Sequence, residues 1–199
     1  MQAVFLDRDG VLNRSHSLNH YRDFRFLEGA REAVRLWNEL GYEAFVVTNQ
    51  GGVGLGYMTE EALRDIHERM VRDIEQAGGR ITDVSACIHK PGEGCACRKP
   101  EPGMLLELIE RYGVDPSQSF MIGDRDVDIR AGEGAGLRTI FIGDKQPPGC
   151  RADYQYPSLL AAVQGLREAG VLGEGEAPAA PEEAGEQPAS SEEAGGTPH

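Results

Sequence analysis

The sequence lacks any long apolar segment and any leader-like start. No window of its 199 residues approaches the roughly 18 consecutive apolar residues of a membrane-spanning helix, so we expect no membrane partner. The first residues form an apolar strand pattern rather than a basic segment, an apolar helix and a cleavage site, which predicts no secretory signal. We therefore expect a cytoplasmic protein.

Positive charge is also in short supply, with 20 lysines and arginines against 33 aspartates and glutamates and a net charge of −13. Residues 173–199 hold seven glutamates and neither lysine nor arginine, among many Ala, Pro, Gly and Ser residues. This composition predicts a disordered acidic tail after a single domain at residues 1–172. An acidic domain argues against nucleic-acid binding, which needs a basic surface.

Cysteine is scarce, and three of the four cysteines are clustered. Cys87, Cys95 and Cys97 lie close to His89 in the sequence, whereas Cys150 stands apart. In a reducing compartment such a cluster is more typical of a metal site than of disulfides. Three thiolates and one imidazole suit a closed tetrahedral Zn²⁺ site with no position left for substrate, which favours a structural metal. One disulfide or free thiols are the alternative.

Short apolar runs alternate with helical patterns along residues 1–172. Strands are expected at 3–6, 43–48, 84–88, 120–122 and 139–142. Helices are expected at 30–40, 103–112, 128–133 and 158–169, and a further helix is expected to follow Thr59, which can cap it. This alternation predicts an α/β protein with a doubly wound, mostly parallel sheet. Ligands of such sheets bind beyond the carboxyl ends of the strands.

Polar residues follow these predicted strands. They are Asp7 and Asp9, Thr48 and Asn49, and Asp124 and Asp128, with Lys99 after the cysteine segment. Carboxylates that meet at one edge repel one another unless a cation is bound, and oxygen ligands beside a phosphate suit Mg²⁺. One carboxylate can attack phosphorus to form an aspartyl-phosphate, and a second can protonate the leaving oxygen and later activate water. The set predicts a phosphatase.

These motifs occur in a fixed order across residues 5–128: DxDG at Asp7 to Gly10, Thr48, Lys99, and GDxxxD at Gly123 to Asp128. In that order they resemble the haloacid dehalogenase superfamily of phosphatases, which implies a Rossmann-like fold. The resemblance makes Asp7 the nucleophile and Asp9 the general acid and base, with Thr48 and Lys99 stabilising the phosphoryl group. It assigns Mg²⁺ to Asp7, the backbone carbonyl of Asp9, and Asp124, and gives Asp128 a possible role in orienting the metal's waters.

The intervals from Asp9 to Thr48 and from Thr48 to Lys99 are filled by ordinary elements and the zinc loop, so we expect no cap domain. A capless member with such a loop resembles two branches, the D-glycero-D-manno-heptose 1,7-bisphosphate 7-phosphatases and the histidinol-phosphate phosphatases. The segments FLDRDGVLN, VVTNQGG and CRKPEPGML favour the heptose branch. Histidinol phosphate, or another small sugar or polyol phosphate, is the alternative substrate.

The resemblance also implies a set of substrate contacts: Ser15, His16, Ser17, Leu18, Asn49, Gln50, Gly51, Arg98 and Arg125. The sequence at 15–18 departs from the DHGY typical of the heptose enzymes, and Leu55 stands where they carry an arginine. A small phosphorylated sugar is thus the expected partner, and we expect a monomer. A non-catalytic binding module would lack the nucleophile or the acid/base, and both are present. A zinc-ribbon nucleic-acid binder would need more basic and aromatic residues around the cysteines.

Overall fold

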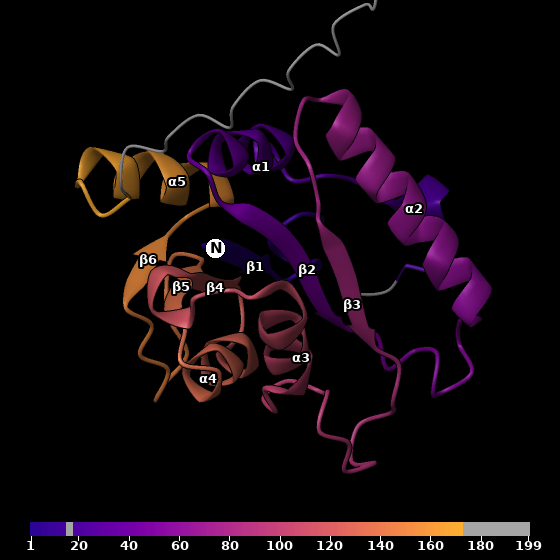
Figure 1. Ribbon diagram of the computed structural model, residues 1–199. Helices are drawn as coiled ribbons and strands as arrows, with labels where there is room; N and C mark the ends of the chain where they lie inside the picture. Colours follow the sequence, from indigo (N-terminus) through magenta and orange to yellow (C-terminus); the bar gives the residue numbers. More distant parts are fainter. Residues whose placement is uncertain (15–17, 173–199) are drawn as a thin grey trace, which may run out of the picture.

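The computed structural model describes residues 1–14 and 18–172. These residues form one six-stranded sheet with helices packed on it (Figure 1). Its strands are β1 (Ala3–Leu6), β2 (Glu43–Asn49), β3 (Asp83–Cys87), β4 (Phe120–Gly123), β5 (Arg138–Ile142) and β6 (Tyr154–Tyr156). The order across the sheet is β3-β2-β1-β4-β5-β6, and every pairing is parallel. The chain winds from β1 in both directions, so the topological switch point lies between β1 and β4.

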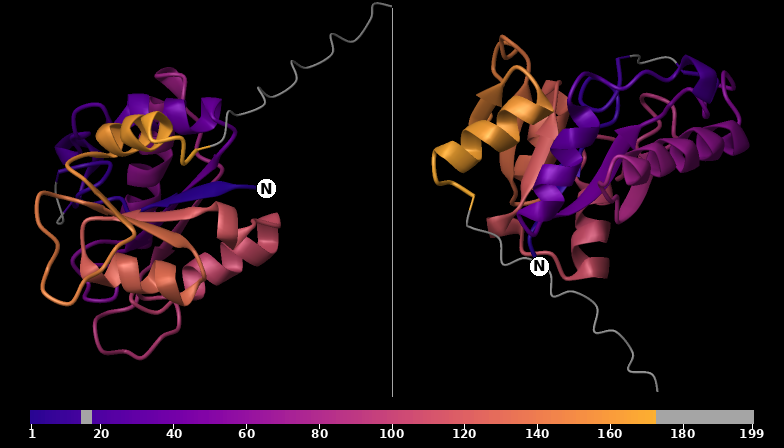
Figure 2. Two further views of the ribbon diagram at one scale, coloured as in Figure 1. Left: turned by 90° about the vertical axis from the view of Figure 1, so that its left-hand side faces the viewer. Right: turned by 90° about the horizontal axis from the view of Figure 1, so that it is seen from above.

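Helices cover both faces of the sheet. On one face lie α1 (Ala30–Glu39), α2 (Glu60–Gln76) and α5 (Leu159–Glu168), and on the other lie α3 (Gly103–Tyr112) and α4 (Asp126–Gly134) (Figures 1 and 2). Two 3₁₀ helices, η1 (Tyr21–Asp23) and η2 (Pro116–Gln118), complete the elements. Strand β1 is buried on both faces because its side chains alternate between the two layers: Val4 and Leu6 face one, and Ala3 and Phe5 the other.

Helix α2 illustrates how the sequence sets an element. The side chain of Thr59 accepts a hydrogen bond from the backbone of Ala62 and caps the helix, as predicted. Leu63, Ile66, Met70 and Ile74 recur on one side and are buried in the core. This packing holds α2 against one face of the sheet.

The predicted fold class is confirmed: a doubly wound parallel sheet with alternating helices. The sequence missed β6, a three-residue strand whose only partner in the sheet is β5 and which no run of apolar residues marks. Helix α4 begins at Asp126, two residues before the predicted start, because the acidic Asp126 and Asp128 interrupt the apolar pattern of its first turn. Within residues 1–14 and 18–172, no further folded unit is inserted between the strands.

Two predictions fall on parts of the chain outside the described residues: the acidic tail at 173–199, and three of the four residues of the first substrate loop, 15–17. Among the helices that are described, none is both long and apolar enough to cross a membrane.

Candidate active site

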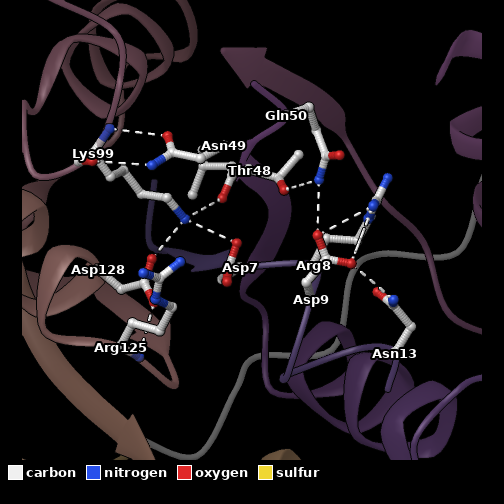
Figure 3. A network of polar contacts seen from close by, with 11 residues as sticks. Asp7, Arg8, Asp9, Asn13, Thr48, Asn49, Gln50, Lys99, Arg125 and Asp128 are labelled. Carbon is white, nitrogen blue, oxygen red and sulfur yellow. Dashed lines mark hydrogen bonds and ion pairs between the residues drawn. The ribbon is translucent and has the colours of Figure 1, made fainter. Parts of the chain in front are cut away.

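The site lies beyond the carboxyl ends of β1, β2 and β4, at the switch point of the sheet (Figure 3). The backbone N–H of Asp7 donates to the carbonyl of Ile122 at 2.9 Å, which extends the pairing of β1 with β4 by one residue and fixes where the nucleophile candidate begins. A pocket of about 70 Å³ opens here, and its lining residues come from four segments: Asp7, Asp9, Asn49, Lys99, Arg125, Val127 and Asp128. The structure therefore brings together side chains that are up to about 120 positions apart in the sequence.

Lys99 holds the centre of this pocket. Its Nζ lies 2.9 Å from an oxygen of Asp7, 2.7 Å from an oxygen of Asp128, and 2.8 Å from the backbone carbonyl of Val47. The lysine is 3% exposed and both carboxylates are almost fully buried, so these are ion pairs shielded from water. Lys99 thereby joins the segment after the cysteines to the ends of β1 and β2.

Asp9 is held by donors from three other residues (Figure 3). The Arg8 guanidinium donates through Nη2 to both carboxylate oxygens, at 3.0 and 3.1 Å. The side-chain amide of Asn13 donates to one oxygen at 2.9 Å, and that of Gln50 donates to the other at 2.8 Å. The acid/base candidate is therefore fixed in one orientation at the wall of the pocket.

Residues after β2 connect the two halves of the site. The side-chain amide of Gln50 also donates to the hydroxyl of Thr48 at 2.8 Å, so one amide group bridges Thr48 and Asp9. Asn49 exchanges two hydrogen bonds with the backbone of Lys99, each 3.0 Å long. The side-chain amides of Asn49 and Gln50, which the sequence predicts as substrate contacts, are thus engaged in holding Lys99 and Asp9.

Gly10 and Gly123 each lie so close to an aspartate side chain that no larger residue would fit. Gly10 has φ +90°, and a Cβ there would lie 2.0 Å from an oxygen of Asp124. A Cβ on Gly123 would lie 2.1 Å from the Cβ of Asp128. The glycines of both predicted motifs, DxDG and GDxxxD, therefore make room for the acidic residues that gather at the site.

The site carries a surplus of negative charge. Four carboxylates, of Asp7, Asp9, Asp124 and Asp128, face two buried cations, Arg8 and Lys99. Burial raises the pKa of Asp7 to about 7, with the neighbouring Asp128 adding to the rise and Lys99 opposing it. Burial alone would lower the pKa of Lys99, but the two carboxylates outweigh it and raise that pKa, so the lysine stays protonated. A bound divalent cation would balance the remaining charge.

The residues at this edge fit a magnesium ion. Oxygens of Asp7, Asp124 and Asp128 lie within 4.8 Å of one another, which lets one ion contact all three. Their hard oxygen donors are those that Mg²⁺ prefers. A cation bound here would favour the ionised form of Asp7, which burial disfavours.

The predicted zinc ligands also come together, at the end of β3. The ligand atoms of Cys87, His89, Cys95 and Cys97 lie within 4.8 Å of one another, and all the cysteines are free thiols. The sulfurs of Cys87 and Cys97 are 3.2 Å apart, and that of Cys97 is 3.2 Å from the Nδ1 of His89. Burial and the neighbouring thiols raise the pKa of Cys97 to about 12, a penalty that a metal bound to the thiolate removes. Three sulfurs and one ring nitrogen fit Zn²⁺.

The remaining predicted substrate contacts have different surroundings. Arg125 is exposed at the mouth of the pocket, and its backbone N–H donates to Asp128. A guanidinium nitrogen of Arg98 lies 3.3 Å from the carbonyl of His89 and close to Gly51. The side chain of Leu18 is 2% exposed and packs in the core, because burial stabilises an apolar group, so a contact between Leu18 and substrate would have to be made by its backbone.

Sequence reasoning missed three residues of the site: Arg8, Asn13 and His67. Arg8 is fully buried, and its Nη1 lies 3.1 Å from Nε2 of His67 on α2. The signal for Arg8 was present in the sequence, because an arginine between two aspartates at the end of a buried strand is placed to pair with one of them. Nothing local in the sequence marks His67, which reaches the site only through the packing of α2.

Known proteins resemble this chain in sequence and in fold. The Hydrolase_like (HAD-hydrolase-like) family model matches residues 96–163. The D-glycero-beta-D-manno-heptose-1,7-bisphosphate 7-phosphatase of Pasteurella multocida (strain Pm70) is 38% identical over 154 residues, which cover 73% of this chain and 84% of that protein. The D-glycero-alpha-D-manno-heptose-1,7-bisphosphate 7-phosphatase of Photorhabdus laumondii is 33% identical over 150 residues, covering 71% of this chain and 82% of that protein.

Solved structures agree. A D,D-heptose bisphosphate phosphatase from B. bronchiseptica, complexed with magnesium and phosphate, superposes with a TM-score of 0.76 at 30% identity, covering 85% of this chain and 99% of that one. The identities, coverage and shared fold confirm the resemblance that the motifs predict. The chain therefore belongs to the haloacid dehalogenase-like phosphatase family, together with the D-glycero-D-manno-heptose-1,7-bisphosphate 7-phosphatases.

Proposed function

We propose that this phosphatase removes the 7-phosphate of D-glycero-D-manno-heptose 1,7-bisphosphate, with Asp7 as the nucleophile. The observation that carries the proposal is the buried triad of Asp7, Asp128 and Lys99 beside Asp9, in a pocket open to solvent on the Arg125 side. The substrate is proposed by analogy with these two heptose bisphosphate phosphatases, which match more than two thirds of this chain.

In the first step, a carboxylate oxygen of Asp7 attacks the phosphorus of the substrate. The new bond joins Asp7 to phosphorus, and the bond between phosphorus and the sugar oxygen breaks with its electron pair left on that oxygen. Asp9 donates its proton to the leaving oxygen, so the sugar departs as a neutral alcohol. Lys99 and the hydroxyl of Thr48 stabilise the negative charge on the phosphoryl oxygens.

In the second step, water releases the phosphate. Asp9, now a carboxylate, takes a proton from a water molecule whose oxygen attacks the phosphorus. The bond from phosphorus to Asp7 breaks, which returns Asp7 as a carboxylate and frees inorganic phosphate. Both steps use Asp9 at one position, which agrees with the way Arg8, Asn13 and Gln50 hold it.

We propose that Mg²⁺ is held by Asp7, the backbone carbonyl of Asp9, and Asp124, with Asp128 close enough to contact the ion or its waters. When bound, it neutralises charge as the phosphoryl group approaches a cluster of carboxylates. The chain's own contribution is the spacing of those carboxylates, which Gly10 and Gly123 make possible.

We further propose that the cysteine cluster binds a structural Zn²⁺ ion. Cys97 comes directly before Arg98 and Lys99, so a metal held by Cys87, His89, Cys95 and Cys97 would fix the backbone from which both cations extend. The two hydrogen bonds between Asn49 and Lys99 fix the same backbone from the other side.

The size of the pocket bears on substrate placement. A pocket of about 70 Å³ is small, which suits a phosphoryl group and leaves the sugar outside. The sugar and its second phosphate would then meet residues around the mouth, where Arg125 is exposed. The cytoplasmic location and monomeric state expected from the sequence stay predictions.

A turnover panel tests the proposal. Phosphate release is measured with both anomers of heptose 1,7-bisphosphate, with histidinol phosphate and with glycerol phosphate, at matched Mg²⁺. The proposal predicts a kcat/KM for a heptose bisphosphate that is at least about 100-fold above the others, the discrimination expected when a site hydrogen-bonds its substrate. Efficient turnover of histidinol phosphate, with none of the heptose bisphosphates, would contradict the proposal and identify the enzyme as a histidinol-phosphate phosphatase.

A further inference from the structure

A half-buried imidazole reaches the acid/base candidate through an arginine. His67 lies on α2, outside the motifs, and its Nε2 is 3.1 Å from Nη1 of Arg8. The same guanidinium binds both oxygens of Asp9 through Nη2 and approaches one of them through Nε at 3.3 Å. The Arg8 guanidinium therefore hydrogen-bonds to the carboxylate of Asp9 on one side and to the imidazole of His67 on the other.

The protonation states follow from the chemistry of the pair. An arginine side chain has donors only and stays charged, so Nε2 of His67 must be the acceptor and the ring proton must lie on Nδ1. Burial, followed by the repulsion of the Arg8 charge, lowers the pKa of His67 to about 3, which keeps the imidazole neutral at neutral pH. The geometry and the charge thus agree on a neutral acceptor.

The position of His67 is rigid. Its neighbours on α2, Ile66 and Met70, are fully buried in the core, so the helix cannot rotate without opening that core. Arg8 is itself 0% exposed. A buried guanidinium that loses one of its acceptors is left with unsatisfied donors and tends to shift toward new ones.

We propose that His67 is a positioning residue, which holds the Arg8 guanidinium in the plane that orients the carboxyl group of Asp9 toward the leaving oxygen. This inference rests on the proposed function, because it gives His67 a task only if Asp9 transfers the proton. His67 touches neither the pocket nor the proposed metal ligands, and it acts through Arg8 alone. Loss of His67 should therefore lower kcat/KM most on substrates whose leaving oxygen needs a proton.

Three variants separate this role from a general structural one. His67→Leu removes the acceptor, and the side chain borders a surface cavity of about 670 Å³ that leaves room for a leucine. His67→Gln keeps an oxygen that can accept from Arg8. Arg64→Leu introduces the same leucine at an exposed position one turn earlier on α2, beside the same cavity, and is the matched control. Circular dichroism and Tm establish that each variant folds.

The readout is kcat/KM, which reports the transfer of the phosphoryl group to Asp7, on two substrates. The heptose bisphosphate has a poor alkoxide leaving group that needs a proton, whereas p-nitrophenyl phosphate has a good one that needs little. His67→Leu should lower kcat/KM about tenfold on the heptose and less than about twofold on the aryl ester, a part of the 10²–10⁴-fold that general acid catalysis supplies. His67→Gln should restore the heptose value to within about threefold, and Arg64→Leu should match the wild type.

Several outcomes would overturn the inference: no loss in His67→Leu, an equal loss on both substrates, or a glutamine variant as slow as the leucine variant. Asp9→Asn serves as the reference for the pattern. If Asp9→Asn loses far more on the heptose than on the aryl ester and His67→Leu does not, the inference fails while the proposed function stands. If the wild type does not turn over the heptose bisphosphate, or Asp9→Asn is fully active on it, the proposed function fails first.

Discussion

Replacing Asp7 with asparagine should abolish phosphate release and yet stabilise the metal-free protein at pH 8. The variant loses the only group proposed to attack phosphorus, so turnover should fall to background. It also removes a buried negative charge from a site that already carries a surplus of them. The nucleophile is thus expected to cost stability, even beside Lys99, whenever no metal ion is bound.

The magnitude follows from the pKa of Asp7. Burial raises this pKa from 3.8 to about 7, so the contribution of the carboxyl to stability is complete below pH 3.8 and is lost as the pH rises through about 7. At about 1.4 kcal/mol per pKa unit, the ionised group costs about 4 kcal/mol at pH 8. At pH 5 the folded protein holds the proton and the cost falls to about 1.5 kcal/mol.

Urea unfolding in EDTA at pH 8 and pH 5 measures this directly. Asp7→Asn should raise the free energy of unfolding by up to about 4 kcal/mol at pH 8 and by about 1.5 kcal/mol at pH 5. Asp144→Asn, at an exposed position, should change it by less than about 0.5 kcal/mol at either pH. Saturating Mg²⁺ should stabilise the wild type by about 2.7 kcal/mol at one hundred times its Kd and should stabilise Asp7→Asn less. A variant that is less stable than the wild type at pH 8 without metal, or a gain that does not vary with pH, would show that the ionised Asp7 does not destabilise the fold.

Three further predictions concern the supports of the site. Cys97→Ser should release zinc, lower Tm and raise KM because Lys99 loses its anchored backbone, and metal analysis with kinetics would check it; full zinc content with unchanged KM would contradict it. Gly123→Ala should destabilise the protein by more than about 2 kcal/mol and weaken Mg²⁺ binding, since its Cβ would lie 2.1 Å from that of Asp128; calorimetric titration with an unchanged Kd would count against it. When the pH falls from 7.5 to 5, the free energy of unfolding should drop by about 2 kcal/mol less in His67→Gln than in the wild type. The reason is that His67 has a pKa near 3 in the folded protein and 6.5 in the unfolded chain, so below pH 6.5 the wild type gains a proton on unfolding. Equal acid sensitivity of the two proteins in chemical unfolding would show that the imidazole is not buried as a neutral group.

The sequence predicted the fold because its signals are local and repeated. Strand β1 and helix α3 have the predicted bounds, since each is marked by an uninterrupted apolar run or a regular helical spacing. Strand β6 carries no such mark: it is three residues long and exists because β5 offers an edge with which to pair. Elements stabilised by a partner rather than by their own pattern are invisible until the fold is known.

The site was predictable to the extent that its residues follow strands. Asp7 comes directly after β1, Thr48 is the last but one residue of β2, and Asp124 comes directly after β4. The carboxyl ends of parallel strands meet at one edge of the sheet, so the topology alone brings these residues together. The packing around Asp9 was not predictable, because it depends on how β2 and α2 lie in three dimensions: Gln50 reaches Asp9 directly, and His67 contacts Arg8, which in turn binds Asp9. For the same reason the hydrogen bond from Gln50 to Asp9 was not predicted, and the substrate contact expected of Gln50 stays a prediction.

In the proposed mechanism, Asp7 takes up the phosphoryl group. The direct measurement is an acid quench during turnover of heptose 1,7-bisphosphate, followed by mass spectrometry of the peptide that contains Asp7. We predict one phosphoryl group on Asp7 of the wild type, none in Asp7→Asn, and accumulation in Asp9→Asn turning over p-nitrophenyl phosphate, because the second step then lacks its base. Turnover of Asp7→Asn near the wild-type rate, or a phosphoryl group found on another residue, would contradict the account.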